Sequence, residues 1–245
     1  MITAQNVPNL PGWMDLGSPD PGASAEFYSR VFGWTAEQVQ AESEQEPGYW
    51  YLRKDGKAVA GLGGLPDPAA RSDWMTYIRV ADAASTTATA EANGAKVRVP
   101  VMPIGPQGSF AQLTDPAGGE FALWQPGEFT GFEACCIDDT VLWAELWTRD
   151  PGAAKAFYPA VFGWQGEPYT EGAPEGGGQD EKWIPHLMVA DADATVARAT
   201  DAGGAVLIPA SDAPPGRLGL LADPFGARFV ILQPTPMAGA GGAPQ

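Results

Sequence analysis

The chain has 245 residues, of which 44% are hydrophobic, so it can build one large domain or two domains of ordinary size. It carries 30 acidic and 14 basic residues, a formal net charge of -16 that repels nucleic-acid phosphates and anionic membranes. No apolar run approaches the ~20 residues that span a bilayer, and the first residues lack the basic flank and apolar stretch of a leader. We therefore expect a cytoplasmic protein with no nucleic-acid or membrane partner.

The first predicted elements are a short strand, a helix and a hairpin. Asp20 is expected to cap the helix, with Pro21 at the first helical position and Gly33 as its left-handed stop. Apolar side chains recur at helical spacing and form one face, namely Phe27, Tyr28, Val31 and Phe32. Short strands follow over 50–62, where Asp55 and Gly56 predict a tight turn.

A second set of elements follows in the same order. Residues 74–83 read as a strand, and Asp82 is expected to cap a weak Ala- and Thr-rich helix that ends at Asn93 and Gly94. Residues 110–125 read as two strands joined by a turn of the pattern DPxG that begins at Asp115. Each set is therefore predicted to be a βαβββ module.

The sequence then repeats itself. Residues 20–34 return as 150–164, residues 74–83 match 183–192, and residues 113–126 match 221–234. The third module is the exception, because the stretch between Gln165 and Lys182 is rich in Gly, Pro and Glu and suits a loop or one short strand. We expect four βαβββ modules with the third truncated, in two domains over 8–127 and 134–234, and a disordered tail over 235–245.

The strand, the Asp-Pro helix start, the motif FYxxxFGW and the closing strand after a DPxG turn resemble the vicinal oxygen chelate (VOC) superfamily. This superfamily includes glyoxalase I, bleomycin-resistance proteins and extradiol dioxygenases. The resemblance covers residues 13–233, and the paired arrangement is most similar to two-domain actinobacterial proteins of glyoxalase-like type. It implies an α+β fold in which the modules pair into two cupped sheets, each enclosing a ligand cavity. VOC folds host several chemistries, so the resemblance specifies the fold more narrowly than the function.

VOC enzymes that use a metal take its ligands from the first and last strands of each module. Counting to these positions gives six residues that are unsuited to a divalent ion, namely Trp13, Met75, Ala122, Trp143, Ile184 and Val230. The chain has a single histidine, and its two cysteines are adjacent. No flavin, nicotinamide or haem motif is visible. We therefore expect no metal and no other cofactor, with a carboxylate-only site for Mg²⁺ or Ca²⁺ as the alternative.

Residues in step with the missing ligands are expected to face the cavities, because side chains alternate along a strand. Asp15 is predicted to be a general acid or base of raised pKa, with Tyr77 or Arg79 holding an oxyanion or carboxylate of the ligand beside it. The other predicted substrate contacts are Trp13, Met75, Arg79, Glu120 and Trp124 in the first cavity, and Trp143, Glu145, His186 and Arg228 in the second. Both sets mix aromatic and polar groups, as small-molecule pockets do.

Structural roles are the alternative for the charged candidates. Asp15 and Glu145 can each be neutralised by an arginine, such as Arg79 or Arg228, and His186 can be a hydrogen-bonded residue of the sheet. The first cavity is the better candidate for the working site, because all of its strands are predicted.

Three functions remain open at this point. The first is a metal-free protein that binds a hydrophobic or aromatic oxygenated metabolite, either to sequester it or to transform it by acid–base chemistry. The second is a metal-dependent glyoxalase-like lyase or isomerase with nonstandard ligands. The third is an interaction module that offers a sheet edge to a partner protein. The sequence does not decide between binder and enzyme. Two cups in one chain favour a monomer or a weak homodimer.

Overall fold

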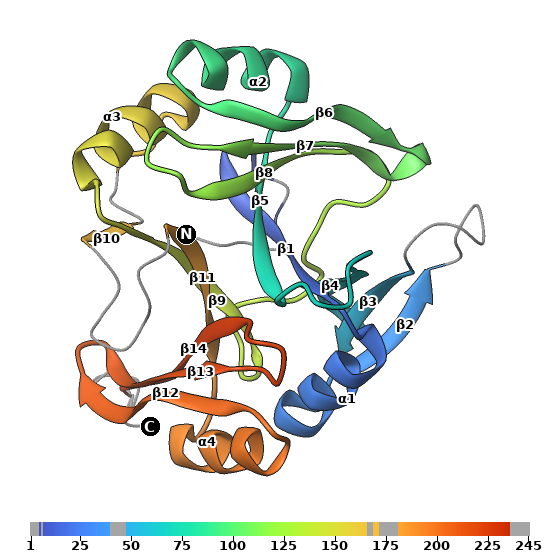
Figure 1. Ribbon diagram of the computed structural model, residues 1–245, viewed down its shortest axis with the longest axis vertical. Helices are drawn as coiled ribbons and strands as arrows, with labels where there is room; N and C mark the ends of the chain where they lie inside the picture. Colours follow the sequence, from blue (N-terminus) through green and yellow to red (C-terminus); the bar gives the residue numbers. More distant parts are fainter. Residues whose placement is uncertain (1–4, 6, 40–47, 166–168, 172–180, 236–245) are drawn as a thin grey trace, which may run out of the picture.

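The computed structural model describes residue 5 and residues 7–39, 48–165, 169–171 and 181–235. These residues form an 8-stranded sheet and a 6-stranded sheet (Figure 1), so the α+β class is confirmed. Apart from Thr235, the tail predicted over 235–245 lies outside the described residues.

The first sheet contains two complete βαβββ modules. The first module is β1 (Leu10–Ser18), α1 (Pro21–Phe32), β2 (Thr35–Val39), β3 (Tyr49–Lys54) and β4 (Lys57–Gly64). The second is β5 (Asp73–Arg79), α2 (Ala83–Ala92), β6 (Lys96–Ile104), a short 3₁₀ turn (Gly105–Gln107), β7 (Gly108–Thr114) and β8 (Glu120–Pro126). The strand order β2-β3-β4-β1-β5-β8-β7-β6 joins the modules through an antiparallel β1–β5 pair.

The second sheet repeats this plan with fewer strands. Its elements are β9 (Thr140–Thr148), α3 (Pro151–Phe162), β10 (Tyr169–Glu171), β11 (Lys182–Met188), α4 (Ala192–Asp201), β12 (Ala205–Ala213), β13 (Gly216–Ala222) and β14 (Arg228–Pro234). The order is β10-β9-β11-β14-β13-β12. Between α3 and β11 the described part of the chain holds only the short strand β10, so the predicted truncation of the third module is confirmed.

Local sequence sets the helix boundaries. The Asp20 carboxylate accepts a hydrogen bond from the Ala23 backbone N–H at 3.0 Å, which satisfies a donor that the first turn leaves free. Gly33 ends α1 with φ 71°, a left-handed conformation that glycine adopts without strain. The repeat has the same arrangement in α3, with Asp150 at the start and Gly163 at the end.

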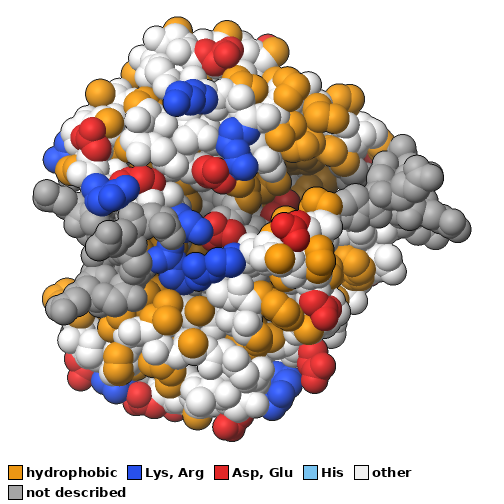
Figure 2. Space-filling model, viewed as in Figure 1, with side chains coloured by type: hydrophobic (Ala, Val, Ile, Leu, Met, Phe, Trp, Pro, Cys, Tyr) orange, Lys and Arg blue, Asp and Glu red, His pale blue; other side chains and the backbone are white. Residues whose placement is uncertain are grey.

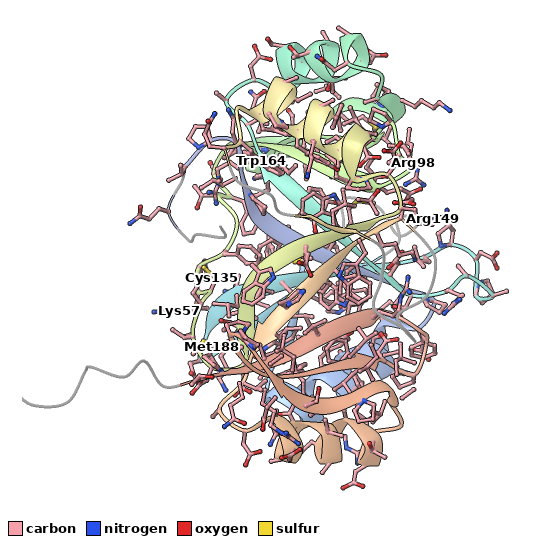
Figure 3. The ribbon with its side chains drawn as sticks, turned by 90° about the vertical axis from the view of Figure 1, so that its left-hand side faces the viewer. Lys57, Arg98, Cys135, Arg149, Trp164 and Met188 are labelled. Atoms are coloured by element: carbon pink, nitrogen blue, oxygen red, sulfur yellow. The ribbon has the colours of Figure 1, made fainter. Side chains whose placement is uncertain are left out.

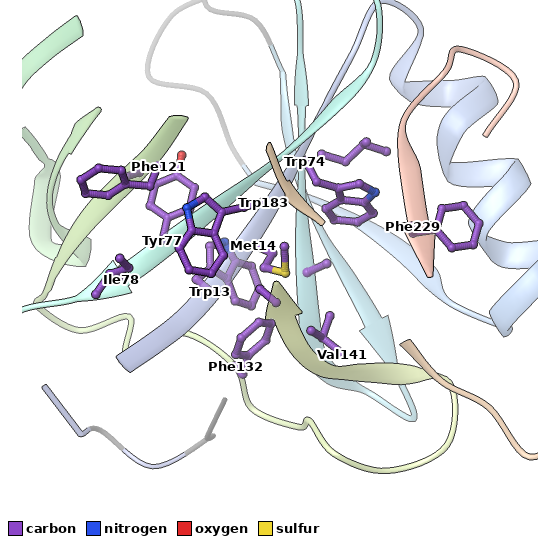
Figure 4. Close-up of a cluster of buried hydrophobic side chains, with 14 of the residues drawn as sticks. Trp13, Met14, Trp74, Tyr77, Ile78, Phe121, Phe132, Val141, Trp183 and Phe229 are labelled. Carbon is purple, nitrogen blue, oxygen red and sulfur yellow. The ribbon is translucent and has the colours of Figure 1, made fainter. Parts of the chain in front are cut away.

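The two halves share one hydrophobic core. α1 packs beside α4, and α3 packs beside α2, so the first helix of each half packs against the second helix of the other half (Figure 1). Figure 4 shows Val141, Trp183 and Phe229 of the second half in the same cluster as Met14 and Trp74 of the first. The aromatic residues of both copies of FYxxxFGW are buried here, except for Trp164, which is half-buried.

A pair of tyrosine–aspartate contacts crosses between the halves. The Tyr158 hydroxyl on α3 donates to Asp115 in the turn before β8 at 2.7 Å, and it accepts a hydrogen bond from the Trp183 indole at 3.1 Å. The symmetric contact from Tyr28 on α1 to Asp223 is longer, at 3.4 Å.

Among the described residues, no helix is both long and apolar enough to traverse a bilayer.

Candidate functional site

A cavity of about 490 Å³ opens between the first sheet and the start of β11. Figure 2 shows the hollow at the centre of one face, with basic and acidic side chains around it. Its wall on the first sheet includes Asp15, Tyr49, Met75, Tyr77, Gln112 and Glu120. Residues 181–183 of the second half close the opposite side. The packing of the two halves therefore completes the cavity.

The Asp15 carboxyl is held by neutral donors. Its Oδ1 accepts hydrogen bonds from the Trp13 indole at 2.6 Å and from the Tyr49 hydroxyl at 2.7 Å. The Tyr77 hydroxyl also hydrogen bonds Asp15 and is itself in contact with Gln112. In the described part of the chain Asp15 has no ion pair with a lysine or arginine.

Glycine on the neighbouring strand makes room for this arrangement. Asp15 on β1 lies opposite Gly61 on the parallel strand β4, and Tyr51 of β3 lies opposite Gly61 on its other side. A β-carbon at Gly61 would overlap both Asp15 and the Tyr49 hydroxyl. The alternation of Gly61 and Gly63 along β4 is therefore part of the site.

Burial raises the pKa of Asp15 above its ordinary value, and the hydrogen bonds from Tyr49, Tyr77 and Trp13 oppose this rise. Burial and the nearby Asp15 raise the pKa of Tyr49 and of Tyr77 well above the ordinary tyrosine value, so both phenols stay protonated. The site thus combines one carboxyl that is costly to ionise with two neutral hydrogen-bond donors. Such a carboxyl keeps its proton to a higher pH than a solvated aspartate does.

Charged pairs surround the mouth of the cavity. Lys182 on β11 pairs with Asp73 on β5 at 2.5 Å and so links the two halves. Arg98 pairs with Glu120 across β6 to β8, and Arg149 pairs with Glu181 at 3.0 Å. Figure 3 places Arg98 and Arg149 on the same side of the molecule.

Four residues predicted from the sequence line the cavity: Asp15, Met75, Tyr77 and Glu120. Trp13 lies behind them and orients Asp15 through its indole N–H. These positions agree with the alternation expected along β1, β5 and β8.

Arg79 and Trp124, which we predicted to contact a ligand, are not among the residues that line this cavity. The Arg79 guanidinium is 1% exposed and donates to backbone oxygens of Thr130 and Gln5. The Trp124 indole donates to the Phe129 backbone oxygen at 3.0 Å. Both side chains bind the connection between the sheets, residues 127–139, because it folds over this end of the first sheet. The alternative in which Arg79 neutralises Asp15 is also not what the structure shows.

The predicted residues of the second sheet form a group of their own. His186 stacks on Trp143, with ring centroids 4.5 Å apart, and its Nε2 lies 3.4 Å from Glu145 Oε2. Glu145 also accepts a hydrogen bond from the Trp147 indole at 3.1 Å. Arg228 is buried at the start of β14.

Sequence reasoning missed Tyr49 and the contribution of residues 181–183 to the wall. The available signal for Tyr49 was its alternation with Tyr51 opposite the small residues Gly61 and Gly63. Residues 181–183 could not be placed, because their position depends on how the halves pack.

The positions that bind metal in VOC enzymes do not suit a divalent ion in this chain. Trp13, Met75 and Ala122 occupy them on the first sheet, and Met75 and Ala122 lie directly opposite Asp15 and Tyr77 in the strand register. The described residues contain no group of three or more His, Cys, Asp or Glu side chains that could hold a metal.

Comparison with known proteins agrees with this geometry. Residues 13–124 match the Glyoxalase-like domain family. The chain is 35% identical over 260 residues to "Anthracycline biosynthesis protein DnrV" of Streptomyces peucetius, covering 93% of this chain and 94% of the relative. It is 34% identical over 253 residues to "Putative glyoxylase CFP32" of Mycobacterium tuberculosis (strain CDC 1551 / Oshkosh), covering 92% of this chain and 95% of the relative.

Solved structures share the fold at low identity. The 2,3-dioxygenase LapB from Pseudomonas sp. KL28 superposes with a TM-score of 0.61 at 15% identity, over 93% of this chain and 94% of that one. The Mn(II)-bound glyoxalase from Novosphingobium aromaticivorans gives a TM-score of 0.58 at 14% identity, over 96% and 92%.

Paired βαβββ modules around a concave sheet define a protein of the VOC fold class. Within that class, the chain belongs to the glyoxalase-like family.

Proposed function

We propose that the protein binds a small hydrophobic or aromatic, oxygen-bearing metabolite in the cavity of the first sheet, and that Asp15 exchanges a proton with it without a metal ion. The observation that carries this proposal is the Asp15 carboxyl, which lies in the cavity wall with Trp13 and Tyr49 as neutral donors at 2.6 and 2.7 Å. A buried acid without a charged partner destabilises the fold, so its presence in a cavity favours a functional role.

The geometry supports a specific division of labour. Both hydrogen bonds from Trp13 and Tyr49 end on Oδ1 and fix the plane of the carboxyl. The ionised group keeps acceptor capacity on Oδ2 for a ligand hydroxyl or an acidic C–H. Tyr77, which stays protonated, can turn its single hydroxyl proton from Asp15 toward an oxygen of the same ligand.

The relatives suggest two kinds of ligand. The name of the Streptomyces relative points to anthracyclines, which are oxygen-rich polycyclic aromatic compounds, and the mycobacterial name points to glyoxalase chemistry. The aromatic wall and the absence of a metal donor set in the described residues favour the first kind for this chain.

The proposal is tested with 2-hydroxyanthraquinone and its methyl ether, 2-methoxyanthraquinone, on untagged protein treated with EDTA. Calorimetry is expected to show that 2-hydroxyanthraquinone binds. Asp15→Asn should weaken this binding about tenfold, which corresponds to a loss of ~1.4 kcal/mol in binding free energy. The methyl ether should lose less than twofold. Equal losses for both compounds would refute the role of Asp15. Binding that EDTA abolishes and Mn²⁺ restores would support the metal-dependent lyase or isomerase instead.

We further propose a cytoplasmic monomer or weak homodimer with no nucleic-acid partner. Sedimentation at several protein concentrations tests the oligomeric state. A dimer that persists at nanomolar concentration would contradict the proposed monomer or weak homodimer.

A further inference from the structure

His186 is the only histidine in the chain, and it is buried on the second sheet. Its side chain is 5% exposed, and among the described residues neither ring nitrogen has a hydrogen-bond partner. Leaving a buried polar group unsatisfied costs about 1–3 kcal/mol, and native structures contain few such groups. The imidazole therefore calls for an explanation beyond the packing of the sheet.

The surroundings of His186 correspond to the site on the first sheet. Strand pairing sets Trp143 opposite His186, as it sets Trp13 opposite Tyr77. Glu145 follows Trp143 by two residues, as Asp15 follows Trp13. The second sheet thus repeats the order of tryptophan, acid and polar ring.

One difference opens the second group toward solvent. Trp13 is 3% exposed, because Phe129 and Phe132 of the connection between the sheets pack on its ring. Trp143 is only half-buried, and the Glu145 side chain is 30% exposed. The acid and one part of the indole can therefore meet a ligand, with His186 directly behind them.

The chemistry of these groups limits the ligand. A carboxylate in a chain of net charge -16 repels anions. Glu145 only accepts hydrogen bonds when ionised, so the ligand must donate. Buried apolar side chains adjoin the site on the same sheet, namely Trp147, Ile184, Leu220 and Val230. Together these features disfavour anions and favour an aromatic ring that bears a hydrogen-bond donor such as a hydroxyl group.

The geometry points to a second small-molecule site, on the second sheet, that takes an uncharged hydroxyl-bearing aromatic ring stacked on Trp143, with its hydroxyl donating to Glu145. His186 is the positioning residue of this site. Its Nε2, at 3.4 Å from Glu145 Oε2, can donate a hydrogen bond to the carboxylate after a small rotation of either side chain. This inference does not depend on the proposal for the first cavity.

The single histidine makes the test direct. In untagged protein labelled with ¹⁵N, the imidazole signals belong to His186 alone, and the probes are 2-naphthol and 2-methoxynaphthalene. We expect 2-naphthol to shift these signals in a saturable way and to bind at least tenfold more tightly than the methyl ether. Glu145→Gln should weaken 2-naphthol about tenfold. Asp15→Asn, in the first cavity, should leave the response unchanged within twofold.

Three results would overturn the inference. The first is a saturated protein whose His186 signals have not moved, and the second is equal affinity for the two naphthalenes. The third is loss of the His186 response in Asp15→Asn, which would place the bound probe in the first cavity. Circular dichroism of Glu145→Gln confirms that the variant is folded, and a matching spectrum makes its loss of affinity specific to the site.

Discussion

Asp15→Asn is expected to make the protein more stable while it weakens the first site. The asparagine keeps an acceptor oxygen for Trp13 and Tyr49, whose bonds both end on Oδ1. It removes a charge that burial makes costly. A shift of one unit in the pKa of Asp15 corresponds to about 1.4 kcal/mol in the free energy of unfolding. Substitutions that remove an unfavourable group of this kind stabilise proteins by about 0.5–2 kcal/mol. For a chain of this size, each kcal/mol raises the Tm by about 2–4 °C.

The sign of the pH dependence follows from the raised pKa. Below the ordinary pKa of 3.8, Asp15 is protonated in both the folded and the unfolded chain and does not affect the stability difference. As the pH rises above 3.8, the unfolded chain ionises first and the folded state loses stability until the pH passes the folded pKa. The advantage of Asp15→Asn should therefore be largest at neutral pH and should shrink as the pH approaches 3.8.

Urea unfolding at pH 7.5 and pH 5 measures this effect. The matched control is Asp73→Asn, an aspartate at the mouth of the same cavity whose pairing with Lys182 is half-exposed and contributes at most about 1 kcal/mol. The control should be neutral or slightly destabilised at both pH values. A loss of 1 kcal/mol or more in Asp15→Asn at pH 7.5 would show that the carboxylate stabilises the fold, and the reasoning would fail.

Three further predictions follow from the same contacts. Gly61→Ala should destabilise the protein by about 1–3 kcal/mol and disrupt the first site, because the added β-carbon overlaps Asp15 and Tyr49. Gly63→Ala is the control, since its β-carbon would lie 3.9 Å from Tyr49 and should be tolerated. Equal unfolding curves for the two variants would contradict this prediction. Tyr158→Phe should lower the free energy of unfolding by about 1–3 kcal/mol, since it removes the 2.7 Å hydrogen bond to Asp115 and leaves the Trp183 indole unsatisfied. Tyr28→Phe should lose less, because its contact with Asp223 is 3.4 Å long. The reverse order in urea unfolding would refute this prediction. The affinity for 2-hydroxyanthraquinone should rise with pH as Asp15 ionises, and the midpoint of this rise should lie above pH 3.8. An affinity that does not change from pH 4 to pH 7 would exclude an ionising Asp15.

The helices and turns were predictable because their signals are local. Asp20 and Gly33 bound α1 through contacts within a few residues, and Asp55 takes the positive φ that a tight turn requires. The repeat extended the same reasoning to the second half. The truncated third module was equally visible, since its Gly- and Pro-rich composition cannot supply three strands.

The site was predictable only where strand alternation decided it. Asp15 and Tyr77 followed from parity along β1 and β5. Tyr49 did not, because its contact with Asp15 depends on the pairing of β1 with β4 and of β4 with β3. The contacts of Arg79 could not be predicted, because nothing local in the sequence indicates that the connection between the sheets folds back over it. Long-range packing, rather than propensity, decides such positions.

The most direct test of the central claim is the visible absorption spectrum of 2-hydroxyanthraquinone bound to EDTA-treated protein. A hydroxyl that donates to the Asp15 carboxylate shifts the chromophore to longer wavelength. We predict this shift in the unmodified protein, its absence in Asp15→Asn, and no change when Mn²⁺ is added. The same shift in both proteins, or a shift that appears only with Mn²⁺, would contradict proton exchange through Asp15 in a metal-free cavity.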